Sequence, residues 1–343
     1  MKKSLKTVCG VGLAAMVASL GLLAGCSGEA EPATEPATDS AVESTAAENL
    51  DTYKVGICQL VQHPALDAAT QGFQDALKEK LGDRVTFDVQ NASGENTNCT
   101  TITSKFVSDQ VDLILANATP ALTAAAEATQ SIPILGTSIT DYATALGIEE
   151  WTGKTGFNVT GTADLAPLEE QAQMFKELLP DVETVGILYC SNEANSKYQA
   201  DVVEASLKDL GYKVETFTFA DSNDLISVTQ QAVSQSDALY IPTDNTAANN
   251  TEAIANVVEP AKIPVIASEE GICEGCGVAT LSISYYDLGY KTGEMAYEIL
   301  VNGAKPAEME IQYAGELTKK YMADRAAELN ITIPDDYVAI EAE

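Results

Sequence analysis

Basic residues and histidine are scarce in this sequence. Of its 343 residues, 19 are Lys or Arg against 51 Asp or Glu, which gives a formal net charge of −32, and His63 is the single histidine. A chain this acidic is repelled by phosphate backbones, and no basic patch offsets the charge. We therefore expect no nucleic-acid partner.

The motifs of common enzyme classes are also missing. The sequence contains neither a phosphate-binding loop of the G-x-x-x-x-G-K-[ST] kind nor the G-x-S-x-G turn of many hydrolases. His63 would need a nucleophile and an orienting acid for catalysis, and neither is visible, so it reads more readily as a helix-entry residue near a cleft. The sequence predicts a protein without catalytic residues, metal ligands or cofactors, rather than an extracellular hydrolase.

Cysteine is too sparse for a disulfide framework. Once Cys9 and Cys26 are set aside with the N-terminal segment, an odd number remains: Cys58, Cys99, Cys190, Cys273 and Cys276. At least one thiol must then stay free or pair outside the chain. The last two have the spacing of half a zinc site, but structural zinc needs four ligands, so a local disulfide or two free thiols is expected there.

The N-terminus has the layout of a secretory signal over residues 1–25. Three lysines within the first six residues precede an apolar stretch over 8–23, and the tetrad Leu23-Ala24-Gly25-Cys26 follows. An uncleaved anchor helix is the alternative, but the small residues before Cys26 favour cleavage. The tetrad resembles the bacterial lipobox, which implies lipidation at Cys26 and a chain held by lipid at the extracytoplasmic face of the cell membrane. Residues 26–50, rich in Ala, Glu, Thr and Pro, would form a flexible acidic tether.

The remaining chain of nearly 300 residues exceeds the usual size of one core, so two lobes are expected. Short apolar runs alternate with helical patterns, first over residues 53–136 and again over 165–267. This alternation is typical of an α/β fold with two doubly wound parallel sheets. The tail predicts a helix over 286–300, a strand over 309–313 and a helix over 318–329. We expect lobe 1 to comprise 51–161 plus 284–306 and lobe 2 to comprise 162–283 plus 307–343.

Polar side chains follow the predicted strands of both lobes. In open parallel sheets ligands bind beyond the carboxyl ends of the strands, where loops meet helix N-termini. Hydroxyls and helix N–H groups there can hold a carboxylate, while Asp or Glu takes an ammonium. Each of these residues has an alternative role as a helix cap. The predicted ligand-binding residues are Gln62, Asn117, Thr119, Ser138, Thr140, Asn195, Ser196, Asp244, Asn245 and Glu269.

Five short motifs appear in an order characteristic of one family. They are His63-Pro64-Ala65-Leu66-Asp67, Ala118-Thr119-Pro120, Asn158-Val159-Thr160-Gly161, Glu193-Ala194-Asn195-Ser196 and Pro242-Thr243-Asp244-Asn245. Over about residues 53–313 the chain resembles the substrate-binding lipoproteins of ABC importers of the tryptophan- and tyrosine-binding type. The resemblance implies a type I periplasmic-binding-protein fold in which a three-segment hinge joins the lobes, and it implies docking on an ABC permease.

The ligand that the resemblance implies is a small amino acid, aromatic in kind: Trp, Tyr or Phe. The chain departs from the family pattern at Asn117, where an aliphatic residue is common, and at Tyr142, where the family usually has proline. Tyr142 would either stack on an aromatic ligand or cover the edge of a lobe. Branched and other amino acids stay open as ligands. A sensory lipoprotein that presents the same solute to a membrane receptor is the alternative function.

Overall fold

The computed structural model describes residues 51–313 and 315–341, which belong to one compact unit. The predicted signal, the predicted lipidation site Cys26 and the predicted tether lie outside the described residues. Within the described ranges no helix has the length and apolar character needed to cross a bilayer.

The first sheet has six strands, all parallel, in the order β11-β5-β4-β3-β1-β2. Their bounds are β1 (Tyr53–Gln59), β2 (Val85–Asn91), β3 (Leu113–Asn117), β4 (Ile134–Ile139), β5 (Val159–Ala163) and β11 (Gln312–Tyr313). Every residue of β3, β4 and β5 is buried because crossover helices cover both faces of the sheet. The helical elements of this lobe are α1 (Pro64–Leu81), η1 (Gly82–Arg84), α2 (Asn96–Ser108), α3 (Thr119–Ala128), α4 (Tyr142–Leu146), α11 (Tyr285–Leu300) and η2 (Pro306–Glu308).

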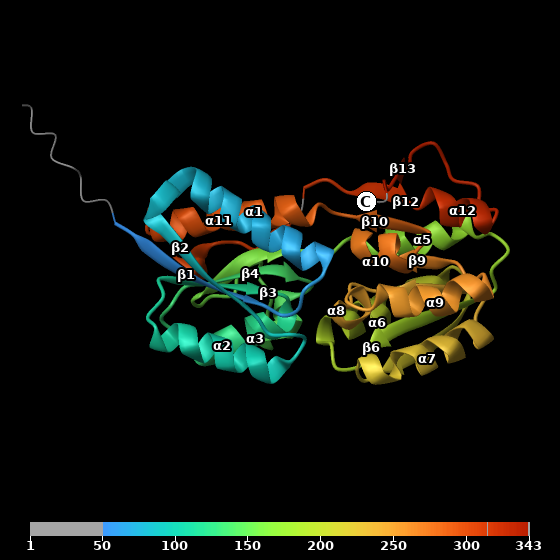
Figure 1. Ribbon diagram of the computed structural model, residues 1–343, viewed down its shortest axis with the longest axis horizontal. Helices are drawn as coiled ribbons and strands as arrows, with labels where there is room; N and C mark the ends of the chain where they lie inside the picture. The colour runs from blue at the N-terminus through green and yellow to red at the C-terminus, as the bar shows by residue number, and fades with distance from the viewer. Residues whose placement is uncertain (1–50, 314, 342–343) are drawn as a thin grey trace, which may run out of the picture. The chain divides into compact units, whose positions relative to one another are not determined.

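Helices α1 and α11 lie side by side although about 200 residues separate them in the chain (Figure 1). Glycine makes this approach possible, because a Cβ atom added at Gly289 would lie 1.9 Å from the carbonyl oxygen of Ala69. The buried stripe of α1, with Phe73 and Leu77 at its centre, packs with Met295 and Ala296 of α11 in one core cluster. A late segment of the sequence thus completes the first lobe.

The second sheet has seven strands in the order β13-β12-β10-β9-β8-β6-β7, with β12 antiparallel to β10 and the other pairs parallel. Their bounds are β6 (Thr184–Cys190), β7 (Lys213–Phe219), β8 (Ala238–Ile241), β9 (Val265–Ala267), β10 (Ala279–Ser282), β12 (Thr318–Tyr321) and β13 (Val338–Ala339). The helices are α5 (Leu168–Leu178), α6 (Ala194–Asp209), α7 (Ser222–Gln235), α8 (Asn245–Ala248), α9 (Thr251–Ala261), α10 (Glu270–Cys276) and α12 (Ala323–Glu328).

The two sheets repeat one topology. Strands β2-β1-β3-β4-β5 of the first correspond in order to β7-β6-β8-β9-β10 of the second. The chain passes between the sheets three times: between β5 and α5, between β10 and α11, and between β11 and β12. The predicted α/β fold with two mostly parallel sheets and three connecting segments is confirmed.

The C-terminal tail differs from its prediction. Residues 318–321 form strand β12 instead of opening a helix, and α12 covers only Ala323–Glu328. Thr318 and Tyr321 favour strands, and the segment pairs with the open edge of β10. Strand β11 pairs with β5, so residues 312–313 lie in the first sheet, whereas the sequence-based boundary gave all of 307–343 to lobe 2. Strand β5 likewise runs to Ala163, beyond the predicted end of this part of lobe 1 at 161, and the remaining lobe boundaries stay predictions.

Several shorter elements refine the alternating pattern expected over 165–267. One helical stretch near its end is divided into α8 and α9, with Asn249 and Asn250 between them. The short helices α4 and α10 and the strand β10 were not foreseen. Each is an element of seven residues or fewer, too short to show a clear hydrophobic period.

Candidate functional site

Buried polar residues gather where the strands of the first sheet end. Asn117 is the last residue of β3, Thr119 begins α3, and Ser138 lies near the end of β4. None of them is more than 7% exposed, and His63 and Thr140 on neighbouring loops are buried as well. Of the predicted residues in this lobe, only Gln62 is exposed.

The backbone is strained at two of these strand ends. Ala118 has a φ of 88° and Ser138 a φ of 57°, which are conformations that favour glycine. The pairing of β4 with β5 shifts register between Gly136 and Ile139, around Ser138. Strain of this kind persists where the surrounding structure holds a side chain in a required direction, and it often accompanies a binding site.

The polar residues of the second lobe are buried too, but they bond mainly within their own lobe. Asp244 is the N-cap of α8: its Oδ1 accepts from the backbone N of Ala247 at 2.8 Å, and its Oδ2 accepts from the backbone N of Cys190 at 2.7 Å. Glu269 caps α10 and accepts from the backbone N–H groups of Gly271 and Ile272. The capping role that the sequence left open is therefore present at both carboxylates.

Burial raises the pKa of these two carboxyl groups. For Glu269 the pKa rises to about 7, because desolvation outweighs the two N–H bonds. Burial and the nearby Glu193 both raise the pKa of Asp244. The side chains are thus costly to hold in charged form, and the helix N-termini that they cap offset part of that cost.

Glu193, which was not among the predicted site residues, lies just before α6 and holds the first turn of α8. Its Oε2 accepts from the backbone N of Asn245 at 2.9 Å and from Asn245 Nδ2 at 2.7 Å, while its Oε1 accepts from the backbone N of Thr246 at 2.8 Å. Asn195 donates from Nδ2 to Thr243 O at 2.9 Å and to Ser196 Oγ at 3.3 Å. The signal that would have found Glu193 is its place in the Glu193-Ala194-Asn195-Ser196 motif.

The strand-end loops of the two sheets contact one another. His63 Nε2 lies 3.3 Å from Asn245 Oδ1, and Gln199 Nε2 donates to Thr140 Oγ1 at 3.2 Å. Because Asn245 Nδ2 donates to Glu193, Asn245 Oδ1 is the atom that faces His63, and His63 Nε2 carries the proton. Burial lowers the pKa of His63, so its ring is neutral and Nδ1 is an acceptor.

Six buried polar atoms at these loops have no hydrogen-bond partner within the described chain. They are His63 Nδ1, Asn117 Oδ1, Thr119 Oγ1, Ser138 Oγ, Asp164 Oδ1 and Asn195 Oδ1. An unpaired buried polar group costs about 1–3 kcal/mol, and native structures keep few of them. Five of the six lie at or beyond the ends of strands of the first sheet, and one belongs to the second lobe.

Asp164 was missed because the predicted first series was closed at Gly161. It follows β5 directly, is 5% exposed, and its Oδ2 accepts from the hydroxyl of Tyr285 at 2.9 Å. Burial raises the pKa of Asp164 to about 6. Its position could have revealed it, because the predicted binding residues of the first lobe also come after strands predicted from the sequence.

A groove of about 450 Å³ opens beside these loops. Residues of both lobes line it, among them Leu60, Glu95, Pro120, Glu193, Asp221 and Asn250. Its walls are largely polar, and they include the loop that Glu193 holds. None of the six residues with unpartnered atoms lines the groove, which reaches the region through Glu193 and Asn245.

Tyr142 is a core residue, which corrects both roles considered for it. Its side chain is 1% exposed, and its hydroxyl donates to Thr162 O at 3.1 Å. The ring lies over Gly136 and Gly161, where an added Cβ atom would come within 2.5 Å of its oxygen. Glycine at both positions creates the space that the ring fills, so it neither reaches a ligand nor covers an edge.

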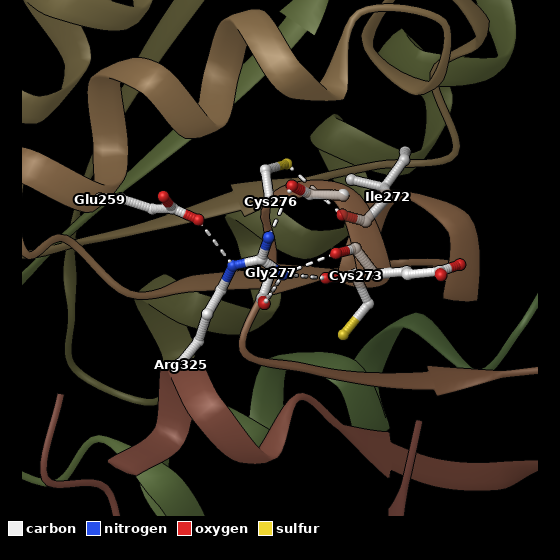
Figure 2. A network of polar contacts seen from close by, with 8 residues as sticks. Glu259, Ile272, Cys273, Cys276, Gly277 and Arg325 are labelled. Atoms are coloured by element: carbon white, nitrogen blue, oxygen red, sulfur yellow. Dashed lines mark hydrogen bonds and ion pairs between the residues drawn. The ribbon is translucent and has the colours of Figure 1, made fainter. Parts of the chain in front are cut away.

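The Cys273-Glu274-Gly275-Cys276 segment forms α10 and holds two free, buried thiols. Figure 2 shows that the two thiols point away from each other, so the free-thiol alternative holds over the local disulfide. Arg325 caps this helix by donating to the carbonyl oxygens of Glu274 at 2.6 Å and Gly275 at 2.8 Å, while Glu259 accepts from its Nε at 2.9 Å. The segment is therefore a structural support for the loop that carries Glu269.

Comparison with known proteins places the chain in a family. The family described as ABC transporter substrate binding protein matches residues 54–343. A tyrosine-binding protein from Clostridioides difficile (strain R20291) is 38% identical over 261 residues, which cover 75% of each protein.

Solved structures agree with that match. A domain from Streptococcus pneumoniae in complex with L-Trp has 34% identity and a TM-score of 0.80, covering 83% of this chain and 97% of that one. A ligand-free, open substrate-binding protein with adhesive properties from Clostridium difficile has 35% identity and a TM-score of 0.66, covering 85% of this chain and all of that one. Because the family match spans nearly all the described residues, the chain belongs to the ABC transporter substrate-binding proteins, whose role is to bind a solute and not to catalyse a reaction.

Proposed function

We propose that this chain is the extracytoplasmic solute-binding component of an ABC importer and that it captures an amino acid, aromatic in kind, between its two lobes. The observation that carries the proposal is the set of six unpartnered, buried polar atoms at the strand ends of both sheets. A solute that satisfied them would recover the free energy of several buried hydrogen bonds.

The chemistry of these atoms suits a zwitterion. The hydroxyls of Thr119 and Ser138 are donors for a carboxylate, and Thr119 also begins helix α3, whose N-terminus favours negative charge. Asp164 Oδ1 and the neutral Nδ1 of His63 are acceptors for an ammonium or another donor. Donors and acceptors are thus both on hand, as an α-amino acid requires.

The relatives support the aromatic class. One is named a tyrosine-binding protein and another was solved with L-Trp. At nearly equal identity, this chain superposes better on the L-Trp complex than on the ligand-free, open structure, with TM-scores of 0.80 and 0.66. The direct contacts of His63 with Asn245 and of Gln199 with Thr140 agree with a closed arrangement of the loops.

The mechanism we propose is closure of the lobes on the solute. Three segments connect the sheets, and a solute that contacts both sets of strand ends would stabilise the shut state relative to the open one. The permease would then distinguish shut from open protein. Acylation at Cys26 would keep the protein at the membrane beside the permease.

Titration calorimetry against the twenty amino acids tests the ligand. We expect heat with at least one of L-Trp, L-Tyr and L-Phe, and a weaker response from amino acids without a ring. Heat only with aliphatic amino acids would contradict the aromatic class. No heat with any of the twenty would contradict the proposed function as a whole.

Two further measurements test transport and anchoring. Cells that lack the protein should lose uptake of the labelled amino acid if it serves an importer, and unchanged uptake would favour the sensory alternative. Replacing Cys26 with Ser should release the protein from the membrane fraction. Retention of the Cys26→Ser protein in that fraction would contradict the lipid anchor.

A further inference from the structure

Four carboxyl side chains are buried at the strand-end loops and are candidates to hold the cationic group of a solute: Asp164, Glu193, Asp244 and Glu269. A buried carboxylate can receive an ammonium only through an oxygen that is not already committed to protein donors. Their hydrogen bonds therefore decide among them.

Three of the four carboxylates are committed. Glu193 uses both oxygens on backbone and side-chain donors of the first turn of α8. Asp244 gives one oxygen to the backbone N of Cys190 and the other to the N-terminus of α8. Glu269 gives both to the first turn of α10. Binding an ammonium at any of them would compete with backbone N–H groups that are themselves buried.

Asp164 differs in the use of its oxygens. Tyr285 Oη donates to Oδ2 at 2.9 Å, and this bond fixes the direction of the carboxyl group. The other oxygen, Oδ1, is buried and accepts no hydrogen bond of good geometry from the described residues, although the nearby Thr140 hydroxyl lowers the pKa of the carboxyl group. Burial raises the pKa of Asp164 to about 6, so the group is charged at neutral pH but would gain from an opposite charge.

We propose that Asp164, oriented by Tyr285, is the carboxylate that receives the cationic amino group of the solute. The proposal rests on the proposed function and narrows it, because it requires a solute with a free, protonated amine. It also shifts the ammonium site away from Asp244 and Glu269, the two carboxylates among the binding residues predicted from the sequence, to a residue between the lobes.

Asp164 and Tyr285 also lie at the connections between the two lobes. Asp164 begins the segment that joins β5 to α5, and Tyr285 begins α11 just after the segment that joins β10 to the first lobe. Two of the three connections between the sheets thus meet at this hydrogen bond. An ammonium seated on Asp164 lies at the hinge, where it favours the arrangement of the segments in which the bond is made.

The test compares Asp164→Asn with Asp244→Asn by calorimetry, using L-tryptophan, L-tyrosine and the amine-free analogue indole-3-propionate. Asp164→Asn keeps the size of the side chain and removes its charge. We expect its affinity for both amino acids to fall at least tenfold, while its preference for L-tryptophan over indole-3-propionate also falls at least tenfold.

Tyr285→Phe, which removes only the orienting hydroxyl, should weaken amino-acid binding about threefold. Asp244→Asn should keep the wild-type preference for the amine.

Several outcomes would overturn the assignment. Wild-type affinity of Asp164→Asn for L-tryptophan and L-tyrosine would do so, as would an equal loss for the amino acid and the analogue, which marks a structural role. Loss of amine preference in Asp244→Asn instead would move the site back to Asp244. A wild-type protein that binds no amino acid overturns the proposed function together with this assignment, so the two failures are distinguishable.

Discussion

The strand-end loops of the two lobes have similar composition and opposite hydrogen-bond states. In the first lobe and its connection, five buried polar atoms have no partner within the described chain, and two backbone positions are strained. In the strand-end loops of the second lobe, Glu193, Asp244 and Glu269 are bonded to backbone N–H groups, and Asn195 carries an unpartnered atom; the other unpartnered groups of this lobe are the hydroxyls of Tyr212, Ser236 and Thr280, away from these loops. The loops of the first lobe thus keep hydrogen-bonding capacity for a solute, whereas the polar groups in the loops of the second lobe bond mainly within that lobe.

The difference teaches that polar loops at strand ends serve two purposes within one fold. In the second lobe, carboxylates stabilise loops by capping short helices, which are marginal in isolation. In the first lobe, uncommitted hydroxyl and amide groups leave hydrogen-bonding capacity for a solute. Substitutions should therefore affect stability more in the second lobe and binding more in the first.

The largest effect of a single substitution is expected for Glu193→Ala in the second lobe. The change leaves the buried donors of Asn245 and Thr246 without an acceptor, which should lower the free energy of unfolding by about 3 kcal/mol. Urea denaturation measures it. Glu204→Ala, a change at a half-buried surface position on the helix that follows Glu193, is the matched control and should cost less than about 0.5 kcal/mol. An equally small loss in the free energy of unfolding for Glu193→Ala would contradict the proposed contrast between the lobes.

The pH dependence of stability should be comparable in size. The folded-state pKa values of Asp164 and Glu269 are raised to about 6 and about 7, so the native state holds protons that the unfolded chain releases above pH 4. The free energy of unfolding of the ligand-free protein should therefore fall by on the order of 4 kcal/mol from pH 5 to pH 7.5, and the raised pKa of buried Asp244 acts in the same direction. Burial lowers the pKa of His63, which opposes this trend at the acidic end.

Denaturation at several pH values tests this slope, and two variants divide it between the lobes. Asp164→Asn and Glu269→Gln remove one titrating group each and should each flatten the pH profile. Stability that rises with pH over this interval would show that the N–H groups around Glu269 outweigh its burial.

A smaller effect is expected for Ser138→Gly in the first lobe. Glycine relieves the strain of a φ of 57° and should raise the free energy of unfolding by about 0.5–1 kcal/mol. The lost hydroxyl should lower amino-acid affinity about tenfold, because hydrogen bonds to charged groups contribute about 1.5–3 kcal/mol. Gln110→Gly, at an exposed position with a φ of 51°, should raise stability without changing affinity. Equal affinities for the two variants would remove Ser138 from the site.

The smallest effect is expected at exposed ion pairs, where the lobes should not differ. Lys197 and Asp201 lie 2.6 Å apart on α6, and Lys291 and Glu294 lie 3.2 Å apart on α11. Asp201→Asn and Glu294→Gln should each change the free energy of unfolding by less than about 0.5 kcal/mol, because water screens both pairs. A larger change at either site, measured by thermal denaturation, would show that the contrast between the lobes extends to their surfaces.

Much of the fold was predictable from local pattern. The buried stripe of α1 and the apolar runs of β1, β3 and β6 have the periods of their elements, so both sheets could be foreseen. Residues 318–321 show the limit, because their strand exists only by pairing with β10. Tyr142 shows another, because the space for its ring comes from Gly136 and Gly161 on two other segments.

The position of the candidate site could be predicted from the sequence, but the roles of its residues could not. Nine of the ten predicted binding residues are buried at the strand ends, yet Asp244 and Glu269 prove to cap helices, while His63, Glu193 and Asp164 carry contacts that were not assigned to them. Composition does not distinguish a capping carboxylate from a binding one, since both require the same residue after a strand.

The sequence by itself determined two parallel sheets with polar loops at their strand ends, because the spacing of apolar residues and the order of strands and helices are local properties. Only the tertiary structure decided which of those polar groups are committed and which are uncommitted. Hydrogen-bond partners come from segments distant in the chain, as Tyr285 does for Asp164 across 121 residues, and burial makes each such choice energetically decisive.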